Sequence, residues 1–195
     1  MPYKWQAFLV VALGIVLGAM DFSGLNLAMP QLAREFNAPP DTVIWVVLGY
    51  SLTFTGVSLS MGRLADIVGV RKVYTAGFLL ITLCLALNSL SQQLWQVVAC
   101  RVIQAFGGAA LVTSYNAILS HAFPEQERGR ALGLSESVVG GALMVSPLFS
   151  GFLIEALDWH AIFYVRIPLG LLGALDRKST RLNSSHVSES RMPSS

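Results

Sequence analysis

Residues 62–72 read GRLADIVGVRK and interrupt the most apolar part of the chain. Long apolar runs lie on both sides of this segment, at 43–61 and at 73–90, whereas the segment itself carries four charged residues. Glycine adopts backbone angles that other residues avoid, so Gly62 and Gly69 predict a tight turn here. The segment is therefore expected to connect two long helices that run in opposite directions.

The composition of the whole chain is that of a membrane protein. The chain has 195 residues, of which 54% are hydrophobic and 12% are charged, whereas soluble proteins carry about 25% charged residues. A helix needs about 20 apolar residues to cross a hydrocarbon core of about 30 Å, and segments in lipid must pair their own backbone groups. Apolar runs occupy residues 5–29, 43–61, 73–90, 95–120, 131–156 and 161–175.

Five of these runs are long enough to span a bilayer, and the last run falls about five residues short of the required length. The sequence thus predicts an all-α integral membrane protein in which residues 1–175 form a transmembrane bundle of six helices. The sixth helix of this bundle is expected to be truncated.

The C-terminal residues, 176–195, differ in character from the rest. They contain seven serines and no apolar period, so they bury too little surface to fold. We expect a disordered segment that is not native to the protein; a natural disordered tail is the alternative. Four of the 13 basic residues and two of the 11 acidic residues lie here. Residues 1–175 are therefore neutral, and no basic patch indicates nucleic-acid binding.

Basic residues between the apolar runs predict the orientation in the membrane. Basic residues favour the cytoplasmic side, and an N-terminus in the cytoplasm places Arg34 alone in an outer loop. The same orientation places six basic residues on the cytoplasmic side: Lys4, Arg63, Arg71, Lys72, Arg128 and Arg130. We therefore expect a multi-pass protein of the inner or plasma membrane with a cytoplasmic N-terminus.

Three polar residues inside apolar runs are candidates for function. Asp21 lies in the first run, and Arg101 and Gln104 share a face of the fourth because they are three residues apart. Charged groups within a bilayer face protein or water and usually serve a function. Asp21 is the first candidate partner for Arg101, and backbone carbonyls are the second. Alternatively, Asp21 is a structural contact, and Arg101 extends towards the lipid headgroups.

The fifth run, 131–156, carries a further acid and several small residues. Glu136 is either a second protonatable group or an interfacial charge, and the sequence favours neither. Small residues allow close helix packing in lipid, and proline kinks a helix. The residues expected to serve packing or kinking are Gly140, Gly141, Pro147 and Gly151.

Several other classes of site are not expected. The three histidines lie in unrelated parts of the chain, so no metal site is predicted, and no cofactor is expected. No nucleophile–base pair recurs at helical spacing, so the sequence does not indicate an enzyme.

Several segments resemble motifs of one transporter family, the major facilitator superfamily. The segment 62–72 resembles the signature loop between its second and third helices, and residues 20–30 resemble the first-helix motif of its fourteen-helix drug:proton antiporter branch. Residues 101–110 resemble its fourth-helix motif. Residues 158–170 resemble the start of its sixth helix, with His160 and Arg166 in place of arginine and asparagine. The matching residues of the first two motifs are Gly62, Leu64, Ala65, Asp66, Gly69 and Arg71, and Asp21, Asn26, Ala28 and Pro30.

The resemblance implies the N-terminal half of a secondary transporter, with the substrate path at the interface with a missing C-terminal half. It implies proton-coupled efflux of drugs or other small organic molecules, so the expected partners are this substrate, protons, the lipid bilayer and the missing half. Asp21 would exchange the proton and Arg101 would tune it. A metabolite permease and a non-transporting fragment are the alternatives.

The resemblance also implies a gate on the cytoplasmic side. In this reading Asp66 pairs with Arg128 or Arg130 and latches the inward face. The gate would be formed by residues of the two cytoplasmic loops, namely Gly62, Asp66, Gly69, Arg71, Arg128 and Arg130.

Overall fold

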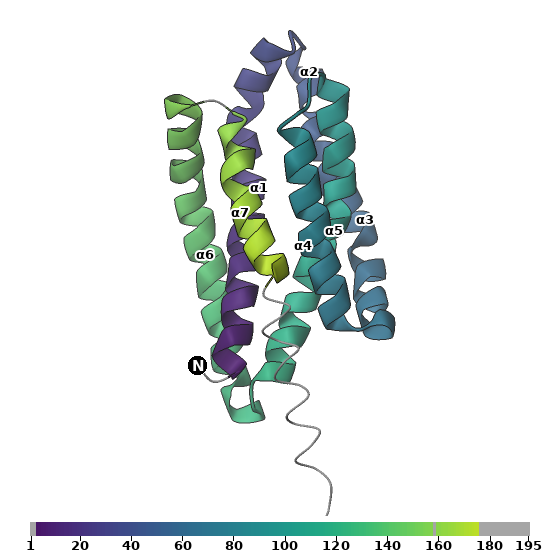
Figure 1. The fold of residues 1–195 in the computed structure, drawn as a ribbon, viewed down its shortest axis with the longest axis vertical. Coiled ribbons are helices and arrows are strands. Elements are labelled where there is room, and N and C mark those ends of the chain that lie inside the picture. Colours follow the sequence, from purple (N-terminus) through teal and green to yellow (C-terminus); the bar gives the residue numbers. More distant parts are fainter. Residues whose placement is uncertain (1–2, 158, 176–195) are drawn as a thin grey trace, which may run out of the picture.

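The computed structural model describes residues 3–157 and 159–175, and these residues contain helices and no strands. The predicted tail at 176–195 lies outside the described residues. The helices, shown in Figure 1, are α1 (Tyr3–Glu35), α2 (Pro40–Val43), α3 (Trp45–Val68), α4 (Val70–Asn88), α5 (Leu94–Ala122), α6 (Glu125–Ala156) and α7 (Ala161–Leu175).

Most of the helices begin or end beyond the apolar runs that predicted them. The segment 62–72 is almost entirely helical, since α3 ends at Val68 and α4 begins at Val70. Gly69 alone makes the turn, with a φ of 107°. The tight turn expected at Gly62 is wrong, because that residue lies inside α3. Apolar residues mark the depth of the hydrocarbon core, whereas a helix continues into water wherever its backbone bonds are kept.

The end of α1 and the start of α6 also lie beyond the predicted bounds, for the same reason. Helix α1 continues through Pro30 to Glu35, although the sequence predicted a helix end near residue 29. Helix α6 begins at Glu125 and includes most of the loop that was expected before residue 131. Glu125 and Glu127 lie in its first turn, where acidic side chains interact favourably with the helix dipole.

The long helices form two groups that lie side by side (Figure 1). Helices α1 and α6 make one group, α3, α4 and α5 make the other, and α7 packs between α1 and α4. The groups meet where α1 packs against α5. This junction positions the candidate site, because its residues come from both groups.

Glycines bring α4 and α5 together at backbone distance. A Cβ atom on Gly77 would lie 2.9 Å from the carbonyl oxygen of Gly107, and the converse distance is also 2.9 Å. The glycines that the sequence singled out for packing behave differently. A Cβ atom on Gly140, Gly141 or Gly151 would meet nothing within 4 Å in the described part of the chain. Close approach of two backbones thus occurs between α4 and α5 and not at these three glycines of α6. Pro147 lies within α6.

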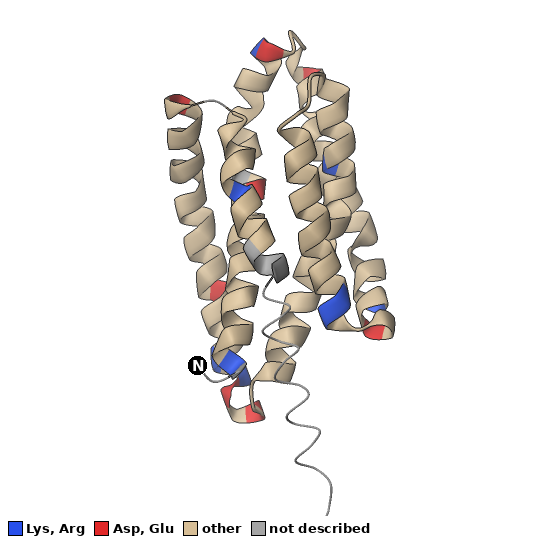
Figure 2. Cartoon of the chain, viewed as in Figure 1, with Lys and Arg blue, Asp and Glu red and all other residues tan. Residues whose placement is uncertain are grey.

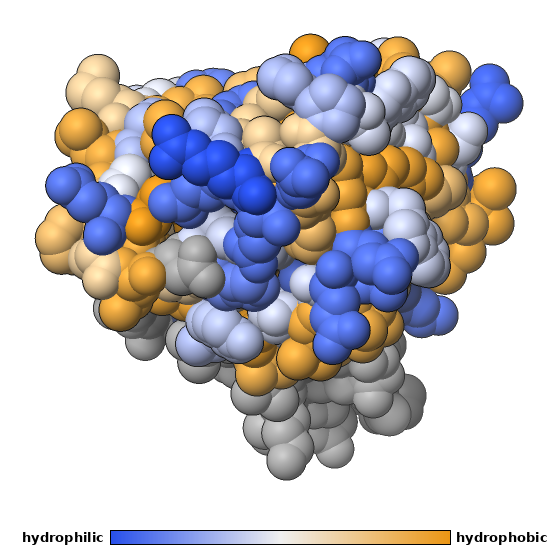
Figure 3. All heavy atoms as spheres, turned by 90° about the horizontal axis from the view of Figure 1, so that it is seen from above, coloured by the Kyte–Doolittle hydropathy of each residue, from blue (hydrophilic) through white to orange (hydrophobic). Residues whose placement is uncertain are grey.

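Five of the described segments are long and apolar enough to cross a membrane, at residues 4–35, 40–68, 70–88, 94–122 and 125–156. The apolar helix α7 is shorter, as the sequence predicted for the sixth span. Charged residues lie mostly at the two ends of the bundle (Figure 2). An end-on view shows hydrophilic residues gathered on the end face, with hydrophobic residues around them (Figure 3).

Candidate functional site

A buried carboxylate joins three helices in the middle of the bundle. Oδ2 of Asp21, on α1, accepts a hydrogen bond of 2.6 Å from Nη1 of Arg101, on α5. Oδ1 accepts one of 3.0 Å from Nε2 of Gln104. The contact that the sequence predicted between Asp21 and Arg101 is therefore present. Only 2% of Arg101 is exposed, so the alternative in which it extends to the headgroups is wrong.

A second guanidinium, which the sequence analysis did not assign to the site, binds the same carboxylate. Nη1 of Arg166, on α7, donates to Oδ1 of Asp21 at 3.0 Å, and its Nη2 donates to the backbone oxygen of Met20. Arg166 is fully buried. The signal that identified Asp21, a charge inside an apolar run, was also present at Arg166. In the sequence analysis Arg166 was noted only as a departure from a motif, because the sequence does not show that α7 packs against α1.

The buried cluster of Asp21, Arg101, Gln104 and Arg166 carries a net charge of about +1 when the carboxylate is ionised. The Nε atoms of both arginines have no hydrogen-bond partner. Taking ions out of water is unfavourable unless they are paired closely. The ring of Tyr50 offers further compensation, because the guanidinium carbon of Arg101 lies 4.2 Å from its centroid.

Replacing Tyr50 by leucine is expected to lower the free energy of unfolding by about 0.5–2 kcal/mol, because the cation–π contact with Arg101 is lost. Tyr50→Phe retains the ring and should keep most of this stability. Thermal unfolding of the purified chain in detergent micelles measures both. Tyr164→Leu is the matched control, since Tyr164 is 52% exposed. Equal losses for the Tyr50→Leu and Tyr50→Phe variants would contradict the contribution of the ring.

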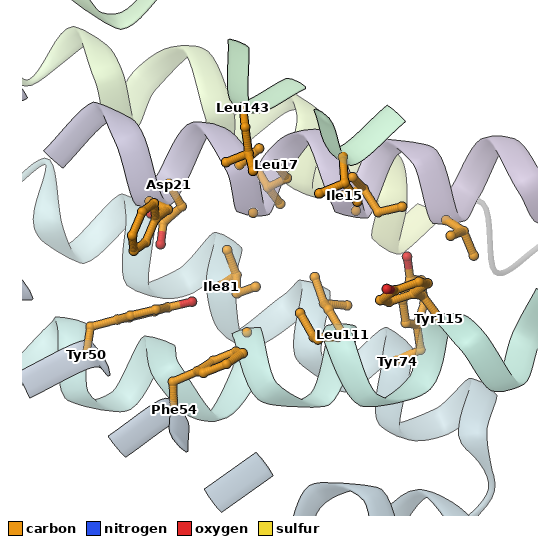
Figure 4. A pocket seen from close by; sticks show the side chains of 18 of the residues that line it. Ile15, Leu17, Asp21, Tyr50, Phe54, Tyr74, Ile81, Leu111, Tyr115 and Leu143 are labelled. Atoms are coloured by element: carbon orange, nitrogen blue, oxygen red, sulfur yellow. The ribbon is translucent and has the colours of Figure 1, made fainter. Parts of the chain in front are cut away.

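A cavity of about 440 Å³ lies next to the cluster, within the size range of small-molecule sites. At one end of the cavity lie Asp21 and Tyr50, and at the other lie Tyr74 and Tyr115 (Figure 4). Most of its lining is apolar. Its charged lining residues are two acids, Asp21 and Glu136, and no lysine or arginine lines it in the described part of the chain.

Glu136 lies on α6 at the Tyr115 end of this cavity. Its side chain is exposed, and its Oε1 accepts a hydrogen bond of 3.1 Å from the hydroxyl of Tyr115. The structure thus places Glu136 at the same cavity as Asp21, but in different surroundings. Asp21 is held by two cations and an amide, whereas Glu136 has one neutral donor.

Two ion pairs lie at the start of α6, beside the predicted gate, and neither of them is the expected latch. Lys4 donates to Oε2 of Glu127 at 2.6 Å, and Nη1 of Arg128 lies 3.9 Å from Oε1 of Glu125. Among the described residues no ion pair joins Asp66 to Arg128 or Arg130. The α3–α4 and α5–α6 turns lie at the same end of the bundle but apart from each other (Figure 1). The latch is therefore not formed in this conformation.

Comparisons with known proteins agree with this arrangement. The sequence model of the Major Facilitator Superfamily matches residues 11–185. The chain belongs to this superfamily. The predicted family and the all-helical fold are thus confirmed, and members of the Major Facilitator Superfamily are multi-pass membrane transporters rather than enzymes.

The matching relatives from this superfamily carry transport and resistance names. The chain is 35% identical over 172 residues to the riboflavin transporter RibZ of Clostridioides difficile, covering 88% of this chain and 38% of the relative. It is 32% identical to the puromycin resistance protein pur8 of Streptomyces alboniger, covering 89% and 35%. It is also 32% identical to the putative multidrug resistance protein MdtD of Pectobacterium carotovorum, covering 88% and 37%. The chain thus spans less than half the length of these relatives.

A solved structure of the superfamily has the same fold. It is a bacterial homologue of the human lysosomal transporter Spinster, in an inward-facing and unoccupied conformation. The TM-score is 0.68 at 18% identity, and the match covers 90% of this chain and 42% of the other.

Proposed function

We propose that this chain forms the N-terminal half of a secondary active transporter, which exports drugs or other small organic molecules in exchange for protons. The observation that carries the proposal is an apolar cavity of about 440 Å³ whose charged lining residues are two carboxylates. Apolar walls suit aromatic and aliphatic substrates. Carboxylates that change charge can couple the movement of protons to that of a substrate. The resistance names of pur8 and MdtD support the export of drugs.

In the complete protein, this half would pair with a C-terminal half in the plasma or inner membrane. The relatives are more than twice as long as the matched region, which supports a C-terminal half that completes the substrate path. The basic residues at the end of the bundle that carries Lys4 support a cytoplasmic N-terminus in the plasma or inner membrane.

We further propose that the cytoplasmic gate forms in another conformation of the transport cycle. In that state Asp66 pairs with Arg128 or Arg130, next to Gly62, Gly69 and Arg71. A partly exposed ion pair contributes roughly 0–1 kcal/mol, which suits a contact that must open in every cycle. The exposed side chains of Asp66, Arg128 and Arg130 are compatible with such re-pairing.

The test of the proposed function uses the complete transporter that contains this chain, in proteoliposomes. A proton gradient imposed across the membrane is expected to drive the movement of puromycin, and a protonophore should abolish that movement. Transport that continues unchanged without the gradient would contradict proton coupling. Empty liposomes and the complete transporter with Tyr164→Leu are the controls.

A specific metabolite permease is the second candidate, and the relative named as a riboflavin transporter favours it. The same proteoliposomes distinguish the two. Movement of riboflavin with no movement of puromycin indicates the permease, whereas movement of several unrelated aromatic drugs indicates multidrug export.

A further inference from the structure

The two carboxylates of the cavity differ in what would happen if each took up a proton. Asp21 is 4% exposed and accepts hydrogen bonds from Arg101, Gln104 and Arg166. All three partners donate, and none of their donor atoms can accept a proton from a carboxylic acid. Protonation of Asp21 would thus leave two guanidiniums, 2% and 0% exposed, without a counter-ion.

Removing one partner of a buried ion pair is strongly destabilising, because the other charge remains buried and uncompensated. A single proton on Asp21 would remove the counter-ion of both Arg101 and Arg166. The Nε atoms of both arginines already lack hydrogen-bond partners. No second carboxylate is near enough to form an ion pair with Arg101 or Arg166 in the described part of the chain. Among the described acids, Asp21 is thus the one that forms ion pairs with these two arginines.

Glu136 can take up a proton without such a loss. Its side chain is exposed and lines the cavity, and it accepts a hydrogen bond from the neutral hydroxyl of Tyr115, which can also accept one. The other titratable groups that line the cavity are Tyr74 on α4, Tyr50 on α3 and Asp21 on α1. None of these lining groups is a cation, so no positively charged side chain of the lining would lose a counter-ion if Glu136 became neutral.

We propose that Glu136 is the group that takes up and releases the proton, and that Asp21 is a structural counter-ion for Arg101 and Arg166. This inference rests on the proposed function and names the proton carrier within it. In the step, an Oε atom of Glu136 binds a proton from cavity water and becomes a neutral acid, which then donates to the oxygen of Tyr115 or to water. Release returns the proton to water on the other side of the membrane. Arg166 acts as a positioning residue, because it holds the carboxylate of Asp21 and the backbone oxygen of Met20.

A carbodiimide that modifies protonated carboxyl groups tests this assignment on the 195-residue chain in detergent micelles. Mass spectrometry reads the modification at each acid, over a range from about pH 5 to pH 8, where ordinary carboxyl groups are largely ionised. Glu136 is expected to be modified more than Asp21, because both oxygens of Asp21 accept hydrogen bonds from buried donors, two of which are guanidiniums, whereas Glu136 is exposed. The comparison uses the unmodified chain, so no variant has to fold. Modification of Asp21 that equals or exceeds that of Glu136 would overturn the proposal.

A matched pair of variants tests the part played by Arg166. Arg166→Gln is expected to increase the modification of Asp21 by about tenfold, whereas Arg166→Lys, which keeps the charge, should leave it low. Arg34→Gln is the control, since Arg34 is exposed near the end of α1. Equal modification of Asp21 in the Gln and Lys variants would refute a charge-based role for Arg166.

The outcome is separable from that of the transport assay. Modification at Glu136 but not at Asp21, combined with transport that ignores the proton gradient, would refute the proposed function and leave the assignment of the titrating group intact. Proton-driven transport combined with modification at Asp21 alone would refute the assignment and leave the function intact.

Discussion

Replacing Asp21 by asparagine is expected to lower the free energy of unfolding by about 3–5 kcal/mol, the range for breaking a buried ion pair by removing one partner. The carboxylate accepts from two buried guanidiniums and one amide. An asparagine offers one neutral oxygen in the same space, and its NH₂ group faces donors. Both arginines would then be buried with no counter-ion. Thermal unfolding in detergent micelles, followed by circular dichroism, measures the loss.

Two further variants make this result specific to the buried charges. Asp66→Asn is the matched control, because Asp66 is exposed, and it should change stability by no more than about 0.5 kcal/mol. The double variant Asp21→Asn with Arg166→Gln removes one of the two stranded charges and should recover part of the loss. An Asp21→Asn protein as stable as the unmodified chain would contradict the account of the cluster.

Replacing Gly107 by valine is expected to lower the free energy of unfolding by about 1–3 kcal/mol, the range for overpacking a close-packed interior. A Cβ atom at Gly107 would lie 2.8 Å from Cγ1 of Ile81 and 2.9 Å from the backbone oxygen of Gly77. A side chain can rotate away, but the backbone oxygen can move only if α4 and α5 separate. Small residues allow this approach between helices in lipid, so the substitution acts on the pair as a whole.

Gly133→Val is the control for Gly107→Val, because it makes the same chemical change in a long helix. A Cβ atom at Gly133 meets nothing within 4 Å, and valine has a higher helix propensity than glycine. The control should therefore be as stable as the unmodified chain or slightly more stable. Equal losses in the two variants would show that contact between α4 and α5 is not the cause.

The contrast between these glycines shows what the sequence could predict. Small residues in an apolar run indicate that a helix can be approached closely, but they do not show which neighbour approaches. The sequence therefore singled out Gly140 and Gly141, which are exposed, and missed Gly77 and Gly107, which are buried. Contact between two helices depends on which face each helix turns towards the other. The sequence of one apolar run does not show which face a neighbouring helix presents.

The candidate site was predicted in part for a related reason. Asp21, Arg101 and Gln104 stood out because a charged or polar group within a span must find a partner, and the predicted contact is present. Arg166 belongs to the same cluster, yet its partner could be identified only once α7 was seen to pack against α1. The different surroundings of Asp21 and Glu136 likewise arise from which helices meet around each carboxylate.

The sequence by itself determined that the chain crosses a membrane as a series of helices, and roughly where each span lies. This information is local, because a segment in hydrocarbon must satisfy its backbone groups with its own hydrogen bonds. Only the tertiary structure decided that two arginines share one aspartate and that the second acid remains with a neutral partner. Those features depend on the faces that distant helices turn towards one another, and on the strength of charge interactions where water is excluded.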